Sequence, residues 1–177
     1  MRIISGIYGR RRFDLPKNFK ARPTTDFAKE NVFNVLNNLL DWEKPMTALD
    51  LFSGTGSIGF ELLSRGCKKV VCVEKDAVHH AFIQKTAKEL KTEDLIAVRG
   101  DVFTYISNTP FRFNIIFADP PYSLPEIPAI PDLIFSGNLL EEGGLFILEH
   151  SSNHSFKEHP RFLQQRVYGS VNFSLFE

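Results

Sequence analysis

Short apolar runs alternate with segments of helical periodicity from residue 47 to residue 150. The runs predict strands, and the spacing of apolar residues between them predicts helices. The predicted strands are 47–52, 69–74, 95–100, 113–118 and 145–150; the predicted helices are one ending at Gly66, 76–90, 102–107 and one near 132–139. Strands that alternate with helices at this spacing indicate a parallel sheet with helices on both faces, so the fold class is α/β.

The two ends of the chain have a different pattern. The opening RIISGIY and the basic stretch after Gly9 predict a β-hairpin or strand pair. Thr24 or Thr25 is then expected to cap a helix that reaches about residue 40. The final RFLQQRVYGSVNFSLFE predicts two strands joined around residues 168–170, which places at least one antiparallel strand on the sheet.

Composition narrows the class of protein. Of the 177 residues, 43% are hydrophobic and 24% are charged, which is typical of a globular protein and disfavours disorder. No apolar stretch approaches the roughly 18 residues of a membrane span, and no signal peptide is visible. The two cysteines, Cys67 and Cys72, support neither a disulfide framework nor a cysteine-based zinc site. We expect a cytoplasmic protein without a metal, with one domain over 1–177: a basic extension over 1–25 and a core over 26–177.

Charge is distributed unevenly along the chain. The formal net charge is zero, but the first 29 residues hold eight basic residues against two Asp, a net charge of +6, and the remainder carries −6. The basic residues are Arg2, Arg10, Arg11, Arg12, Lys17, Lys20, Arg22 and Lys29. Such a segment attracts polyanions, although from charge alone a solvated basic edge is an equally good interpretation.

A glycine motif connects the first strand of the alternating region to the following helix. Gly54, Gly56 and Gly59 form the pattern G-x-G-x-x-G, in the context that binds a cofactor at a helix N-terminus. Twenty residues after Gly54, Glu74 ends the next strand, where its carboxylate can accept hydrogen bonds from ribose hydroxyls. These features fit a nicotinamide cofactor and S-adenosylmethionine equally well.

Two further acids favour S-adenosylmethionine. Asp50 lies four residues before Gly54, where a carboxylate would repel a pyrophosphate but suit the cationic amino group of a methionine moiety. Asp101 follows the strand 95–100, where it could accept from the exocyclic amine of adenine. The structural alternatives are that Asp50 caps the loop, that Glu74 begins the next helix, and that Asp101 is a helix N-cap.

The sequence Asp119-Pro120-Pro121-Tyr122 follows the strand 113–118. An exocyclic amine on a base is a poor nucleophile because its lone pair is delocalised into the ring, so acceptors must hold its hydrogens. The Asp119 carboxylate and the Pro120 carbonyl can accept them, while two prolines restrict the loop. Tyr122 offers a face on which a base can stack. The alternative is an ordinary turn rich in turn-forming residues.

These motifs resemble a known family. LDLFSGTGSIG, Glu74, Asp101 and DPPY are similar to those of class I S-adenosylmethionine-dependent amino-methyltransferases. RIISG at the N-terminus, RPTTD at 22–26 and LLSRG at 62–66 resemble the RsmD family, which methylates the exocyclic amine of one guanine in small-subunit (16S) ribosomal RNA. The resemblance implies a Rossmann-like, seven-stranded, mostly parallel sheet. It also implies S-adenosylmethionine as cofactor, the small ribosomal subunit as partner, and a monomeric enzyme.

The resemblance also assigns roles to individual residues. The cofactor positions that it implies are Asp50, Phe52, Gly54, Gly56, Glu74, Asp101 and Val102. The amine-binding, catalytic positions are Asp119, Pro120, Pro121 and Tyr122. The RNA-facing positions are Arg2, Arg10, Arg11, Arg12, Arg22, Thr24 and Thr25.

Other functions remain open from the sequence. The DPPY loop does not specify the base, so an enzyme acting on another amine, such as that of adenine in RNA or DNA, would have the same loop. A non-catalytic RNA-binding or assembly factor could retain the fold, although it would not need Asp50, Glu74 and DPPY together. A nicotinamide dehydrogenase fits least well, because neither DPPY nor Asp50 has a role in hydride transfer.

Overall fold

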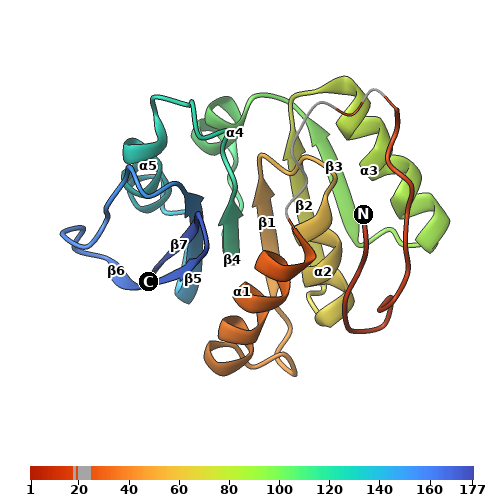
Figure 1. Cartoon of the computed structure of the whole chain (residues 1–177), viewed down its shortest axis with the longest axis horizontal. Helices are drawn as coiled ribbons and strands as arrows, with labels where there is room; N and C mark the ends of the chain where they lie inside the picture. Colours follow the sequence, from red (N-terminus) through yellow and green to blue (C-terminus); the bar gives the residue numbers. More distant parts are fainter. Residues whose placement is uncertain (18, 20–24) are drawn as a thin grey trace.

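A mixed β-sheet forms the centre of the computed structural model, which describes residues 1–17, 19 and 25–177 (Figure 1). Within these residues the sheet has seven strands in the order β3-β2-β1-β4-β5-β7-β6. They are β1 (Thr47–Leu51), β2 (Lys69–Glu74), β3 (Leu95–Arg99), β4 (Phe113–Ala118), β5 (Leu140–His150), β6 (Phe162–Tyr168) and β7 (Val171–Phe176). Strands β1 to β5 pair in parallel, and β7 pairs antiparallel with both β5 and β6. The predicted parallel sheet with an antiparallel C-terminal hairpin is confirmed.

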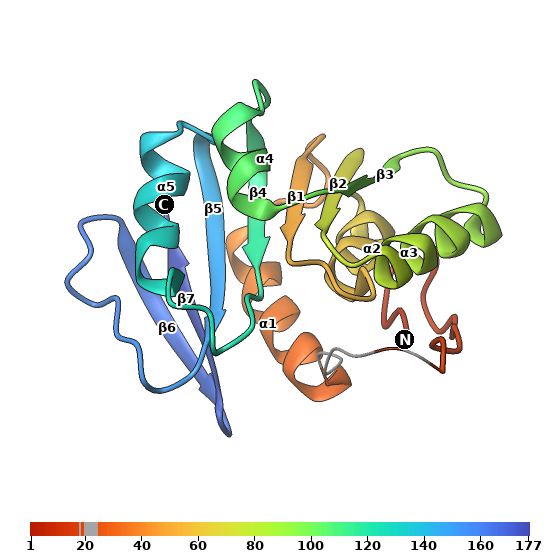
Figure 2. The same ribbon diagram turned by 90° about the horizontal axis from the view of Figure 1, so that it is seen from above.

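Helices cover both faces of the sheet (Figure 2). One face packs against α1 (Asp26–Leu39), α2 (Ser57–Arg65) and α3 (Ala77–Leu90). The opposite face packs against α4 (Val102–Asn108), the short 3-10 helix η1 (Ile127–Ala129) and α5 (Ile130–Ser136). Successive strand residues alternate between these two cores: in β1, Ala48 belongs to the first and Leu49 to the second.

Two elements differ from the prediction by more than one residue. Strand β5 begins at Leu140 instead of 145, because Leu140 pairs with Phe113 before a register shift that accommodates the polar Glu141–Gly144 stretch. Helix α5 lies two to three residues earlier than predicted, because Pro131 occupies its first turn and the chain leaves the helix at Gly137 and Asn138.

The N-terminal segment forms a short version of the predicted hairpin. Arg2 and Arg12 make an antiparallel bridge, and Met1 and Phe13 exchange two backbone hydrogen bonds, at 2.7 and 2.8 Å.

The hairpin packs on α2 through its backbone. The N–H groups of Ile4 and Ser5, beyond the bridge, donate to the Glu61 carboxylate in α2, at 2.7 and 3.0 Å. Helix α2 therefore satisfies backbone groups that the short hairpin leaves without a strand partner.

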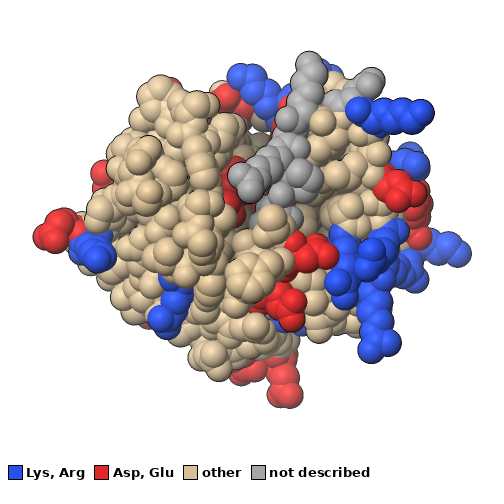
Figure 3. All heavy atoms as spheres, in the orientation of Figure 1, with Lys and Arg blue, Asp and Glu red and all other residues tan. Residues whose placement is uncertain are grey.

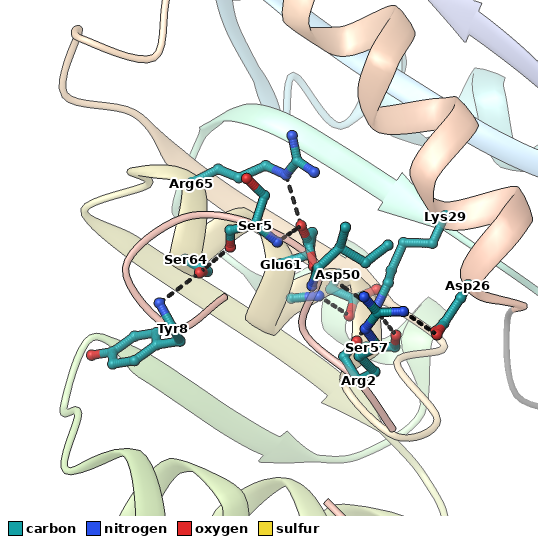
Figure 4. A network of polar contacts seen from close by, with 12 residues as sticks. Arg2, Ser5, Tyr8, Asp26, Lys29, Asp50, Ser57, Glu61, Ser64 and Arg65 are labelled. Carbon is teal, nitrogen blue, oxygen red and sulfur yellow. Dashed lines mark hydrogen bonds and ion pairs between the residues drawn. The ribbon is translucent and has the colours of Figure 1, made fainter. Parts of the chain in front are cut away.

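A buried ion-pair network joins this segment to α1 and α2 (Figure 4). The side chains of Lys29 and Glu61 are both fully buried, with 3.8 Å between Lys29 Nζ and Glu61 Oε2. Lys29 also donates to the Arg2 carbonyl and to Ser57 Oγ, and Arg65 Nε donates to Glu61 Oε1 at 2.8 Å. Burial lowers the pKa of Lys29, while the charge of Glu61 opposes that shift. Lys29 is therefore an interior residue, although it counts towards the charge of the basic segment.

We expect Lys29→Met to destabilise the protein by about 3 kcal/mol, because a buried carboxylate then loses one of its two cationic partners. Urea unfolding measures this difference. Lys44→Met is the matched control, since Lys44 pairs with Asp41 at the surface and should change the free energy of unfolding little. Equal effects of the two substitutions would contradict a stabilising role for the network.

A candidate cofactor and base-binding cavity

A cavity of about 710 Å³ lies at the carboxyl ends of the parallel strands. It lies where the strand order reverses between β1 and β4, which is where open α/β sheets bind ligands. Its walls come from segments that follow successive strands, from the start of α1 and from the β6–β7 turn. These segments are 52–55, 74–76, 101–103 and 119–122, with Phe19, Thr25, Ala28, His79, Leu124, Glu149, Ser170 and Val171.

Glu74 fixes the glycine loop at the cavity wall. Its Oε2 accepts from the Gly54 N–H at 2.7 Å, and its Oε1 accepts from the Asp76 N–H at 2.8 Å. Gly54 has a φ of +53°, and a Cβ placed on it would meet no atom within 4 Å. The loop therefore opens onto the cavity with its backbone exposed to a ligand, while Asp76 caps α3 by accepting from Val78 and His79.

Asp50 does not line the cavity. Its side chain is buried, and its Oδ2 accepts from the Gly59 N–H in α2 at 2.9 Å. Burial raises the pKa of Asp50 to about 8; the hydrogen bond from Gly59 opposes the shift, and the charges of Asp119 and Glu74 add to it. Asp50 is therefore not placed to contact the amino group of a ligand in this cavity, although the sequence had led us to expect this contact. Asp50 instead holds the first turn of α2 against β1. This role is close to the structural alternative given by the sequence, in which Asp50 caps the loop.

Gly56 and Gly59 are also structural. Gly56 has a φ of +73° at the N-cap of α2 and lies outside the cavity lining. A Cβ on Gly59 would lie 2.3 Å from Cys72 Sγ in β2, so this position has no room for a side chain. The third glycine of the motif thus allows α2 to pack closely on the sheet.

Asp101 is the helix N-cap that the sequence offered as one interpretation, and it also lies in the cavity wall. Its side chain accepts from the N–H groups of Phe103 and Thr104 in α4. The pKa of Asp101 is lowered by these hydrogen bonds, most of all by the one from Thr104. Lys75 Nζ lies 3.4 Å from Asp101 Oδ2 and lowers the pKa further. Phe52 and Val102 line the cavity beside it.

The 119–122 loop forms the opposite wall. The Asp119 N–H donates to the Leu51 carbonyl at 3.3 Å, which ties the end of β4 to the end of β1. Tyr122 is 42% exposed, and its hydroxyl donates to Glu149 Oε1 at 3.0 Å. The aromatic ring is therefore anchored at one end while part of it stays accessible.

Acidic side chains dominate the charge of the cavity. Among the described lining residues, the acids are Glu74, Asp76, Asp101, Asp119 and Glu149, against the single cation Lys75 and the imidazole of His79. A cavity with this charge favours a cationic ligand and disfavours the pyrophosphate of a dinucleotide. Glu149 was not among the residues predicted for the site, although it follows the apolar run LFIL near the end of a strand, as Asp119 follows IIFA.

The basic residues form a separate surface. Arg10, Arg11 and Arg12 are exposed on the N-terminal segment, outside the cavity lining, where Lys and Arg side chains gather in Figure 3. Arg2 pairs with Asp26 at 3.6 Å. Thr25 lines the cavity and caps α1 through its hydroxyl, which accepts from the Ala28 N–H. The expectations for Arg22 and Thr24 fall outside the described residues.

No membrane-spanning helix occurs in the part of the chain that the structure describes, and the same residues hold no group of three or more potential metal ligands.

Comparisons with known proteins agree with this architecture. A relative in Bacillus subtilis, the provisionally named rRNA methyltransferase YlbH, is 35% identical over 157 residues, covering 85% of this chain and 82% of its own. Ribosomal RNA small subunit methyltransferase D of Haemophilus influenzae is 28% identical over 184 residues, covering 100% of this chain and 93% of its own. The structure of yhhF from Escherichia coli, provisionally named a methyltransferase, matches with a TM-score of 0.85 at 26% identity. The match covers 99% of this chain and 96% of the yhhF chain.

The sheet order, the glycine loop and these neighbours define a Rossmann-like methyltransferase fold. The chain belongs to the family described as conserved hypothetical protein 95, whose model matches residues 1–177. The resemblance to the RsmD family expected from the sequence is confirmed.

We expect the stability of the protein to fall as pH rises from about 4 towards 8, through the contribution of Asp50. A carboxyl in the unfolded chain titrates near pH 4, so in this window the folded state holds one proton more than the unfolded state, and raising the pH favours unfolding. Asp50→Asn should flatten this dependence in urea unfolding. Asp41→Asn, at an exposed carboxyl, should leave it as in the wild type; parallel curves for the wild type and Asp50→Asn would refute the assignment.

Proposed function

We propose that this protein transfers a methyl group from S-adenosylmethionine to the exocyclic 2-amino group of a guanine in small-subunit ribosomal RNA. The observation that carries the proposal is a single acid-lined cavity that runs from the glycine loop at Gly54 to the amine-binding loop at 119–122. The names of the relatives support ribosomal RNA as the substrate class.

The cavity suits S-adenosylmethionine in size and charge. Its volume lies in the range of cavities that bind small molecules, about 300–1,000 Å³. Its acids complement a ligand that carries a sulfonium and an ammonium group. The carboxylate of Glu74 accepts two backbone hydrogen bonds and retains acceptor capacity for ribose hydroxyls. Phe52 and Val102 offer apolar contact for a base beside Asp101.

The 119–122 loop would hold the guanine that receives the methyl group. The Asp119 carboxylate and the Pro120 carbonyl would accept the two hydrogens of the amine and turn its lone pair towards the methyl donor. Tyr122 would stack on the base, held in place by its hydrogen bond to Glu149. Because the amine must leave the RNA stack to reach this cavity, the nucleotide would be flipped out or unpaired.

Catalysis would rest on orientation and electrostatics. The cofactor supplies an electrophilic methyl group; a carbon–nitrogen bond forms as the carbon–sulfur bond breaks. The amine becomes positively charged during transfer, and the neighbouring carboxylates of Asp119 and Glu149 stabilise that charge. One amine proton then leaves to Asp119 or to water, so no covalent enzyme intermediate is required.

The basic N-terminal segment would contact the RNA backbone outside the cavity. Arg10, Arg11 and Arg12 are exposed there, and Arg11 lies over the ring of Tyr8 at 5.8 Å. Separating a basic outer surface from an acidic cavity would let phosphates bind without competing for the cofactor site. We further propose that the enzyme acts as a cytoplasmic monomer on the small ribosomal subunit or an assembly intermediate.

The direct test is label transfer. Purified protein, S-adenosylmethionine labelled in the methyl group and unmethylated small subunits should yield labelled N2-methylguanosine after digestion of the RNA to nucleosides. Label in an adenosine derivative, or none in RNA despite cofactor binding, would reject the proposed function.

We expect Asp119→Ala to lower the rate of methyl transfer strongly while S-adenosylmethionine binds with nearly unchanged affinity. The loss of an oriented carboxylate at the amine should cost about 2–4 kcal/mol of transition-state stabilisation. Single-turnover kinetics give the rate and titration calorimetry gives the affinity. Turnover within a few-fold of the wild type would show that Asp119 does not orient the amine.

Replacing Arg10, Arg11 and Arg12 together by Ala should weaken RNA binding and flatten its dependence on salt. Each lost phosphate contact removes about 0.7 to 0.9 from the slope of log affinity against log salt concentration. Binding measured at several salt concentrations gives the slope, and cofactor binding serves as the control for folding. An unchanged slope would indicate a solvated basic edge that does not touch the RNA.

A further inference from the structure

Glu149 is the second-to-last residue of β5, beside the amine-binding loop. The last paired residues of β4 and β5 are Ala118 and Leu148, so Asp119 and Glu149 are the next residues on two adjacent parallel strands. Glu149 is 6% exposed, and it lines the same cavity as Asp119 and Tyr122. Two carboxylates from neighbouring strands therefore border the place proposed for the base.

The alternation of the strands puts both carboxylates on one face of the sheet. Phe117 and Ile147, two residues before Asp119 and Glu149, belong to the core that packs against α1. Thr25, the N-cap of α1, and Ala28, in its first turn, line the cavity on that same face. Asp119 and Glu149 thus both face the space between the sheet edge and the start of α1.

The edge of guanine that carries the 2-amino group matches two adjacent acceptors. That edge presents the N1–H beside the amine, so it offers donors at neighbouring atoms. Adenine presents an amine beside an N1 that carries no hydrogen and accepts. We propose that Glu149 accepts the N1–H of the target base while Asp119 accepts from the amine, and that Glu149 thereby selects guanine. This inference rests on the proposed function and names the residue that sets its base specificity.

The contact with Tyr122 is compatible with this role. A carboxylate has lone pairs for several hydrogen bonds, so accepting from the Tyr122 hydroxyl at 3.0 Å leaves capacity for the base. The same hydrogen bond fixes the position of Glu149 relative to the stacking ring. A base that stacks on Tyr122 would therefore be presented to a carboxylate whose position is already set.

The rejection of a base without the N1–H follows from burial. A base whose N1 carries a lone pair would place two acceptors against each other in a site shielded from water, and such a mismatch leaves both groups unsatisfied. Sites that hydrogen-bond a substrate group discriminate strongly against analogues that lack it. If Glu149 only anchors Tyr122, no such discrimination is expected.

The test uses 2-aminopurine, which keeps the 2-amino group but has no hydrogen on N1. Small subunits are reconstituted with ribosomal RNA that carries either guanine or 2-aminopurine at the methylated position. The wild-type enzyme should prefer guanine by about 10- to 100-fold in kcat/KM. Glu149→Gln, whose amide can donate to the unprotonated N1, should reduce that preference to near parity or reverse it.

Tyr122→Phe is the matched control, because it removes the hydrogen bond to Glu149 but keeps the carboxylate. It should slow transfer to both bases and leave their ratio in favour of guanine. Because each preference is a ratio measured on one protein sample, partial misfolding of a variant cancels. Equal use of both bases by the wild type, or an unchanged preference in Glu149→Gln, would overturn the assignment of Glu149. Failure of the wild type to methylate guanine at all would overturn the proposed function itself.

Discussion

The reversal of strand order between β1 and β4 is the constraint on which the site depends. After β1 the chain passes into α2 on one face, whereas after β4 it passes into η1 and α5 on the other face (Figure 2). The loops that leave these two neighbouring strands therefore diverge and leave a crevice at the carboxyl edge. The hydrogen bond from Asp119 to Leu51 joins the two loops at the base of that crevice. The glycine loop and the DPPY loop consequently face each other across one cavity.

The acids around this cavity also support the local backbone. Glu74 holds Gly54 and Asp76, Asp101 caps α4, and Glu149 anchors Tyr122. Asp50, behind the loop, binds the Gly59 amide. Because the side chains of Glu74, Asp101 and Glu149 are fixed by these contacts, the negative field of the cavity is built before a ligand arrives. A site organised in this way suits a reaction whose main requirement is the orientation of a cationic donor and an amine.

Local patterning was enough to predict most of the fold. Strands β2 and β4 have the predicted bounds because continuous β-branched and apolar runs between polar turns leave no alternative period. Local patterning did not indicate that the amides of Ile4 and Ser5 in the N-terminal hairpin bind Glu61, which lies far away in the sequence. The burial of Lys29 was missed for the same reason. Only tertiary structure reveals that a lysine on the apolar stripe of α1 meets a buried glutamate.

The site was predictable in position but less so in detail. The motifs located the glycine loop, Glu74 and Asp119 through their places at strand ends. They did not indicate that the Asp50 carboxylate turns towards α2, since that depends on the closeness of Gly59 and Cys72. Glu149 escaped notice because no motif surrounds it, and its importance comes from the register between β4 and β5.

We infer that the crevice at the strand reversal binds the methyl donor on its glycine-loop side and leaves the 119–122 loop for the substrate. Amide hydrogen exchange with and without S-adenosylhomocysteine, the product form of the donor, locates the segments that the donor covers. Exchange should slow in the segments 52–57, 74–79 and 101–104, with a smaller effect at β6, the edge strand of the sheet. Protection confined to other parts of the chain, or no protection at a saturating concentration of the compound, would contradict this inference.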